Sequence, residues 1–217
     1  MNFLRASRAV LPILLFGLLA GCAGGLLGNG GKPSELYRFG TLESVEPTAQ
    51  ESRTHRSVAL ERVNFAPEIE GDRILAVHDG SARYIKGSRW VPAAPSLFAH
   101  AVVQSFQSRA PGFRITTSQR GELSGYSLVI SISRFEAQYK DAGMALPPVI
   151  AIEGDATLYG LADRQIISQR HFLNRVAATE NRAGAIAATF DLATKGYVAD
   201  VVDWVVALDA MPRTRSH

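Results

Sequence analysis

The sequence has one cysteine, Cys22, in 217 residues. A single thiol cannot form an internal disulfide, so the fold must depend on burial of apolar side chains. The sequence also lacks a large excess of charge, since 23 Lys and Arg stand against 20 Asp and Glu, for a formal net charge of +3. Arg5 and Arg8 supply two of these charges and precede the domain. This balance argues against nucleic acid as a partner.

Motifs for catalysis or metal binding are missing as well. The five histidines are His55, His78, His100, His171 and His217. None stands at metal-ligand spacing from another histidine or a carboxylate. The chain has no G-x-S-x-G elbow, and the glycine-rich run from Gly28 to Ser34 lacks the spacing and the preceding strand of a phosphate loop. We therefore expect no catalytic residue, no metal and no bound cofactor.

One apolar run stands at the N-terminus. Arg5 and Arg8 precede the stretch from Ala9 to Leu19, which is too short to span a bilayer. Leu19-Ala20-Gly21-Cys22 follows and resembles the lipobox of bacterial lipoproteins. This order predicts a signal peptide over residues 1–21 and lipid attachment at Cys22, with a diacylglycerol on the sulfur and an N-acyl chain on the new amino end. An ordinary signal peptide with a chance cysteine, or a membrane anchor, is the alternative.

Composition divides the remainder of the chain. Residues 22–34 are rich in glycine and predict a flexible lipid-anchored tether. Residues 35–210 suit a single domain with its own core, and residues 211–217 predict a solvated tail. No second stretch is apolar and long enough for a transmembrane helix.

Hydrophobic periodicity predicts an α+β fold, a two-layer sandwich of a mostly antiparallel sheet covered by two helices. Asp79-Gly80 predicts a hairpin. Helices are expected from about Ser96, as a cap, to Arg109, and from about Arg182 to Leu208. The expected strands are 36–39, 58–65, 74–78, 82–85, 113–116, 126–139, 150–159 and 165–176. The last three form a meander with one dry and one wet face.

Four features follow one another along the chain: Tyr37-Arg38-Phe39, the stretch from Val63 to Ile74, the pair Arg89-Trp90 directly before the first helix, and the long closing helix. In this order they resemble the ABC-type transport auxiliary lipoproteins, a family that accompanies lipid transporters containing MCE proteins. The resemblance covers nearly all of the chain after the tether. It implies a non-catalytic auxiliary subunit on the periplasmic face of the outer membrane. The implied partners are a periplasmic MCE protein and an ABC permease and ATPase.

Two alternative functions remain open at this point. One is a structural or chaperone lipoprotein of an outer-membrane complex, and the less favoured one is an envelope hydrolase. The candidate partner-contact residues are Met144, Leu146, Arg89 and Trp90. Met144 and Leu146 lie in the linker from Asp141 to Pro148, which we expect to be flexible and to serve a partner or a homo-oligomer. Trp90 is expected more to pack against the sheet than to contact a partner.

Replacement of Cys22 with Ala should abolish lipidation, because the chain has no other thiol. The variant should accumulate as unprocessed precursor or leave the membrane fraction, as seen by fractionation and immunoblotting. Retention in the membrane at the mature size would contradict the lipobox interpretation. Ala23, rather than Asp, follows the cysteine, so the native protein should fractionate with the outer membrane.

Overall fold

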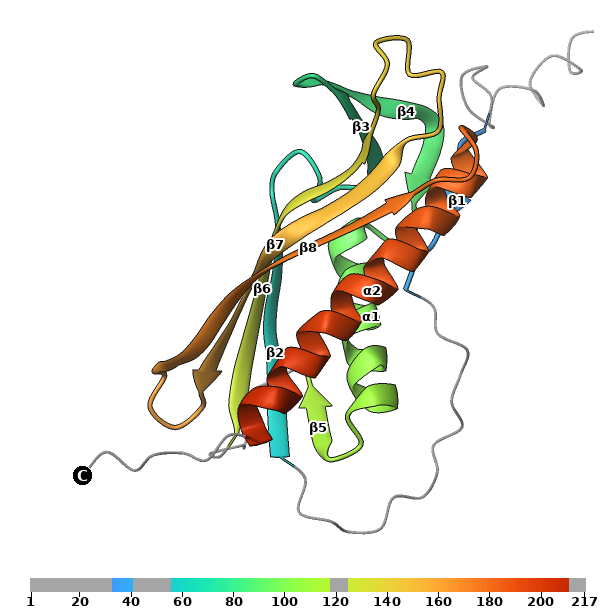
Figure 1. Ribbon diagram of the computed structural model, residues 1–217. Helices are drawn as coiled ribbons and strands as arrows, with labels where there is room; N and C mark the ends of the chain where they lie inside the picture. Colours follow the sequence, from blue (N-terminus) through green and yellow to red (C-terminus); the bar gives the residue numbers. More distant parts are fainter. Residues whose placement is uncertain (1–32, 41–55, 118–124, 211–217) are drawn as a thin grey trace, which may run out of the picture. The chain divides into compact units, whose positions relative to one another are not determined.

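Two helices pack on one face of an eight-stranded sheet in the computed structural model, which describes residues 33–40, 56–117 and 125–210 (Figure 1). The described chain from Ser34 onward forms one compact unit. The predicted signal peptide with Cys22, nearly all of the predicted tether, and the predicted tail at 211–217 lie outside the described residues. The predicted α+β two-layer architecture is confirmed.

Each predicted segment corresponds to one observed element. In chain order these are β1 (Glu35–Tyr37), β2 (Arg56–Phe65), β3 (Arg73–His78), β4 (Ser81–Trp90), α1 (Ala94–Arg109), β5 (Phe113–Thr116), β6 (Tyr126–Gln138), β7 (Val149–Gly160), β8 (Ile166–Ala177) and α2 (Ala183–Ala210). The prediction that Ser96 caps α1 is wrong. The helix begins at Ala94 without a side-chain cap, because Pro95 in its first turn already has the φ that a helix needs.

β6 organises the sheet because it has neighbours along both of its edges. β7 pairs with one edge over its full length, from Tyr126 to Gln138. The other edge is shared, since β2 pairs with residues 126–132 and β3 pairs with residues 136–138. The rest of the sheet is built outward from these strands: β5 joins β2, β4 joins β3, and β1 joins β4.

The sheet is mixed rather than simply antiparallel. The long ladders β6–β7 and β7–β8 are antiparallel and confirm the predicted meander, and β3–β4 forms the predicted hairpin. Asp79 and Gly80 both have positive φ there, as a type I′ turn requires. The pairings β1–β4, β2–β5, β2–β6 and β3–β6 are parallel. The sequence pattern of a single strand does not indicate these pairings, because they join segments distant in the chain.

A bulge in β6 keeps its dry face continuous. The register with β7 shifts between Ile132 and Arg134, which leaves Ser133 as the extra residue. Ile130 and Ile132 before the bulge, and Phe135 after it, are therefore all buried on the same side. Opposite the bulge stands Gly154, where a Cβ atom would lie 2.3 Å from the carbonyl oxygen of Ser131.

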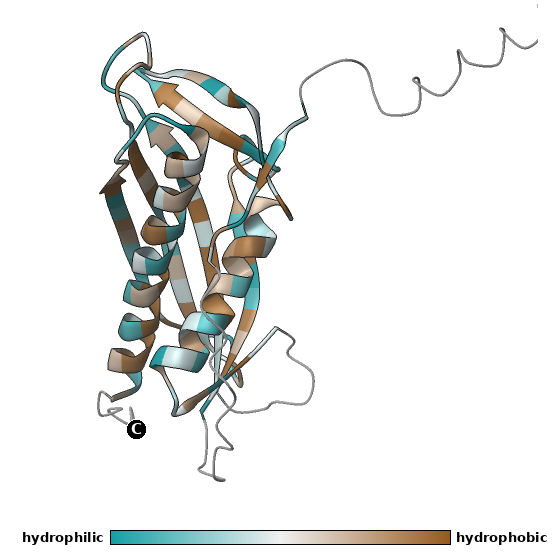
Figure 2. Cartoon of the chain, turned by 90° about the vertical axis from the view of Figure 1, so that its right-hand side faces the viewer, coloured by the Kyte–Doolittle hydropathy of each residue, from teal (hydrophilic) through white to brown (hydrophobic). Residues whose placement is uncertain are grey.

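The helices cover this dry face with the predicted apolar stripe. Ile186, Phe190, Tyr197 and Trp204 of α2 are buried, with Phe190 0% and Trp204 7% exposed, which confirms their predicted inward orientation. Figure 2 shows hydrophobic and hydrophilic residues alternating in bands along the strands and both helices. None of the described helices has the length and apolar character needed to cross a membrane.

Aromatic rings join most of the elements at the centre of this layer. The ring centroid of Phe135 on β6 lies 4.7 Å from that of Phe190 on α2 and 5.1 Å from that of Phe39. Trp90 at the end of β4 packs edge-on against Phe39 and Phe190, at 5.0 and 5.2 Å. Such pairs stabilise the fold beyond the burial of their area alone.

Replacement of Phe190 with Ala should lower the free energy of unfolding by about 3–5 kcal/mol, because it removes a fully buried ring and leaves a cavity between α2 and β6. Urea denaturation followed by circular dichroism measures this loss. Leu192 on the same helix is 59% exposed, so Leu192→Ala should change the value by no more than about 0.5 kcal/mol. Equal losses in the two variants would contradict the observed orientation of α2.

Candidate functional site

The pair Arg89-Trp90 has a structural role at the junction of β4 and α1. Trp90 is 1% exposed and belongs to the aromatic cluster, which corrects its place among the partner-contact candidates. Its backbone N–H donates to the carbonyl oxygen of Asp72 at 2.6 Å. The guanidinium of Arg89 binds both carboxylate oxygens of the same Asp72, at 2.8 and 3.0 Å. Arg89 is therefore a paired surface residue, and the sequence motif marks the end of a strand.

Hydrogen bonds hold the backbone of the loop that carries Met144 and Leu146, for which the sequence predicts flexibility. Asp141 closes it from within, since its carboxylate accepts hydrogen bonds from the amides of Ala145 and Leu146 at 2.7 and 3.3 Å. These bonds, led by that from Ala145, lower the pKa of Asp141. Met144 is half-buried with a positive φ, whereas Leu146 is 60% exposed.

Asn181, just before α2, fastens the same loop to the domain. Its amide nitrogen donates to the carbonyl oxygens of Met144 and Ala145 at 2.8 and 2.9 Å. Its amide oxygen accepts a hydrogen bond from the hydroxyl of Tyr139 at 2.8 Å. Burial raises the pKa of Tyr139, so this donor stays protonated. The loop is thus a preformed projection with an exposed leucine on it.

The wet face of the sheet carries a network of charges. Both ring nitrogens of His171 face carboxylates, with Nδ1 3.1 Å from Asp155 and Nε2 3.2 Å from Glu153. Arg134 also pairs with Glu153. Because both nitrogens are engaged by acidic groups, His171 is not arranged as a base beside a hydroxyl nucleophile. His100 lies exposed on α1.

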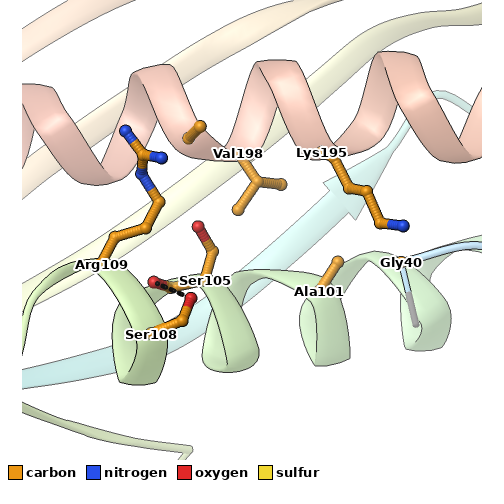
Figure 3. Close-up of a pocket in the computed structure, with 8 residues that line it drawn as sticks. Gly40, Ala101, Ser105, Ser108, Arg109, Lys195 and Val198 are labelled. Atoms are coloured by element: carbon orange, nitrogen blue, oxygen red, sulfur yellow. Dashed lines mark hydrogen bonds between the residues drawn. The ribbon is translucent and has the colours of Figure 1, made fainter. Parts of the chain in front are cut away.

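A narrow cleft lies between the two helices. Figure 3 shows Ala101, Ser105 and Arg109 of α1 facing Lys195 and Val198 of α2. Its volume is about 180 Å³, which is below that of ordinary small-molecule sites. The charged residues on it already have partners, since Arg109 pairs with Asp203 and Lys195 with Asp191. The cleft therefore serves helix packing.

A wider hollow of about 500 Å³ lies beside β8. Phe172, Trp204 and Leu208 form its apolar part, and Arg170 and Asp200 are among its polar residues. It opens along the edge of the sheet, because β8 has a strand neighbour, β7, on one side only within the described chain. Among the described residues, no group of three or more His, Cys, Asp and Glu side chains is placed to hold a metal ion.

Exposed apolar side chains are concentrated on this edge strand. Ile166, Ile167 and Leu173 are 59%, 46% and 49% exposed. All three residues fall within the strand predicted at 165–176. The sequence feature that could have indicated their exposure is the pair Ile166-Ile167, because two consecutive apolar residues break the alternation of a half-buried strand. The register with β7 shifts at this point, so that Ile167 has no partner residue across the ladder.

Loss of the Asp141 carboxylate should loosen the loop. In an NMR titration, the Ala145 amide signal should shift as the pH falls, with a midpoint below 3.8, the ordinary value of this carboxyl. Because the pKa of Asp141 is lowered in the folded protein, the hydrogen bonds are intact at pH values above 3.8. They are lost as the pH falls through the pKa of the folded state. In Asp141→Ala this transition should disappear, and hydrogen exchange at Ala145 and Leu146 should become severalfold faster. A midpoint above 3.8 would contradict the assignment.

Solved structures similar to this chain show the same fold. A protein from Xanthomonas campestris assigned to DUF330 aligns with a TM-score of 0.66 at 22% identity, covering 81% of this chain and 97% of that one. A second crystal structure, of an uncharacterised protein, aligns with a TM-score of 0.64 at 12% identity, covering 80% of this chain and 99% of that one. No curated protein matches the chain.

The family match extends over most of the chain. Residues 40–202 match the family described as the ABC-type transport auxiliary lipoprotein component. The matched range runs from Gly40, after β1, to Val202 in α2, and it contains the complete sheet from β2 to β8. The chain therefore belongs to the family of ABC-type transport auxiliary lipoproteins, which are envelope proteins associated with a membrane and with a transporter.

Proposed function

We propose that this protein is a non-catalytic auxiliary subunit of an ABC transporter that moves lipids across the bacterial envelope together with a periplasmic MCE protein. The family match over residues 40–202 is the observation that carries this proposal. The arrangement of side chains agrees with a binding role, because the polar groups described above are engaged in ion pairs and hydrogen bonds rather than converging on a cavity. The subunit acts through its surfaces, without turnover.

The lipid anchor belongs to the same proposal. Cys22 carries the diacylglycerol and the N-acyl chain, and these hold the domain at the periplasmic face of the outer membrane. More than one acyl chain on a residue gives stable anchoring where a single chain would be marginal. No other cofactor is needed for this role.

The free edge of β8 is the surface best suited to the transporter partner. Among the residues that the structure describes, no second strand pairs with its 12 residues along this edge, and the apolar side chains of Ile166, Ile167 and Leu173 are exposed there. Such an edge is a template for strand addition by another chain. Arg170 and Arg175 give the strand two positive charges, and it has no carboxylate of its own. A partner segment that is extended, apolar and acidic fits this edge.

The positive charge also weighs against pairing of β8 with a second copy of itself. Two such strands side by side would bring Arg170 and Arg175 of each chain near like charges, which destabilises the pair. A heterologous partner avoids this repulsion. The MCE protein is the partner that we propose for this edge.

Replacement of Leu173 with Ser should weaken capture of the MCE component roughly ten- to a hundredfold, the equivalent of losing about 1.5–3 kcal/mol of apolar burial at an interface. Affinity purification of the tagged lipoprotein from solubilised envelopes, with quantification of the bound MCE, permease and ATPase subunits, measures this. Leu192→Ser is the matched control, because Leu192 is 59% exposed and lies on α2 rather than on β8.

The identity of the captured protein separates the rival functions. An MCE or ABC component lost with Leu173→Ser and kept with Leu192→Ser supports the proposal. Capture of an outer-membrane protein in place of MCE or ABC components indicates instead a structural or chaperone lipoprotein. Unchanged capture of the MCE component by both variants excludes the β8 edge as the contact surface.

A further inference from the structure

The chain enters the domain at the same end as the Asp141–Pro148 loop. Tyr37 of β1 lies next to Gly184 in the first turn of α2, and Asn181, just before that helix, binds the loop. Figures 1 and 2, seen from directions at right angles, both place β1, the start of α2 and this loop toward one end of the sheet. The β7–β8 turn and the end of α2 lie toward the opposite end.

Covalent geometry limits the distance of this end from the membrane. Eleven residues, 23–33, stand between Cys22 and Ser34. A chain of this length spans at most about 40 Å when fully extended. The 28 residues of α2 alone are about 42 Å long. A lipid on Cys22 therefore keeps the loop end within about 40 Å of the bilayer, and the β7–β8 turn lies at the opposite end of the domain (Figure 1).

The loop has the chemistry of a membrane contact. Residues 142–147 carry no charge, and Leu146 among them is 60% exposed. The neighbouring Asp141 directs its carboxylate at the loop's own amides, and Glu180 is paired with Arg182. Lys140, exposed at the base of the loop, suits the phosphate level of a phospholipid layer.

The backbone of the loop is already held in place, so little conformational entropy would be lost when Leu146 inserts into a membrane. The hydrogen bonds from Asp141 and Asn181 fix its backbone before any contact is made, so insertion costs little ordering of the chain. Transfer of this exposed apolar side chain from water to the level of the acyl chains lowers the free energy.

We propose that the Asp141–Pro148 loop rests on the phospholipid bilayer that holds the anchor, with Leu146 inserted at the level of the acyl chains. This inference rests on the proposed lipidation of Cys22. The contact orients the domain, so that β8 runs away from the membrane surface and presents Ile166 and Ile167 at its far end, where a periplasmic partner arrives.

Site-specific fluorescence on the lipidated protein tests this orientation. Acylated Cys22 has no free thiol, so a cysteine placed at Leu146 is the sole labelling site. Leu146→Cys carries an environment-sensitive fluorophore, and Ile166→Cys, at a position of 59% exposure near the opposite end, is the matched control. Both proteins are reconstituted into vesicles of phosphatidylethanolamine and phosphatidylglycerol with brominated acyl chains, which quench only at contact.

The label at position 146 should lose at least half of its fluorescence to the brominated lipid, and the label at position 166 less than a tenth. Equal quenching at the two sites, with the protein floating with the vesicles, overturns the orientation and leaves the anchor intact. Failure to float overturns the anchor and the orientation together. Quenching at 146 that disappears on adding the MCE protein, or a response at 146 to that protein alone, assigns the loop to a protein partner and also overturns the inference. Thermal unfolding of each labelled variant confirms that the domain is folded.

Discussion

Burial of aromatic rings around Phe135 is the constraint on which the rest of this structure depends. The ring contacts Phe39, Phe65, Trp90, Phe98 and Phe190, which come from five other parts of the chain. A chain with one cysteine has no internal disulfide to do this work. The strands and helices around Phe135 are held together by these ring contacts. The bulge at Ser133 brings Phe135 to the dry face of β6, where the other rings lie.

Local patterns in the sequence were sufficient for the elements and for the dry face of the sheet. Alternation in 126–139, 150–159 and 165–176 predicts a meander because consecutive antiparallel strands need only a turn between them. The sharing of one edge of β6 by β2 and β3 has no such local signal. It depends on tertiary contacts: β2 ends at Phe65, and β3, in which Ile74 is buried, takes the next part of the same edge of β6.

The surface residues were harder to predict, since the sequence does not say which apolar residues remain exposed. Trp90 was expected to pack against the sheet more than to contact a partner, and the structure places it in the core. Leu146 was a candidate contact residue, and the structure leaves its side chain 60% exposed. The hydrogen bond from Asn181 to Ala145 in this loop spans 36 residues of the chain, so no local pattern indicates it. Ile166 and Ile167 are exposed because β8 is an edge, which is a property of the sheet rather than of the strand.

The shared edge of β6 also affects the order in which the chain can fold. β2 and β6 pair across about 70 residues, and the dry face of the sheet is closed by α2, the last of the described elements. Contacts of such sequence separation form slowly, because loop closure must precede them. The core therefore stays open until the C-terminal helix has been made. With the signal peptide that the sequence predicts at residues 1–21, the chain would cross a membrane before it folds, and late closure of the core would keep it in a form that can be translocated.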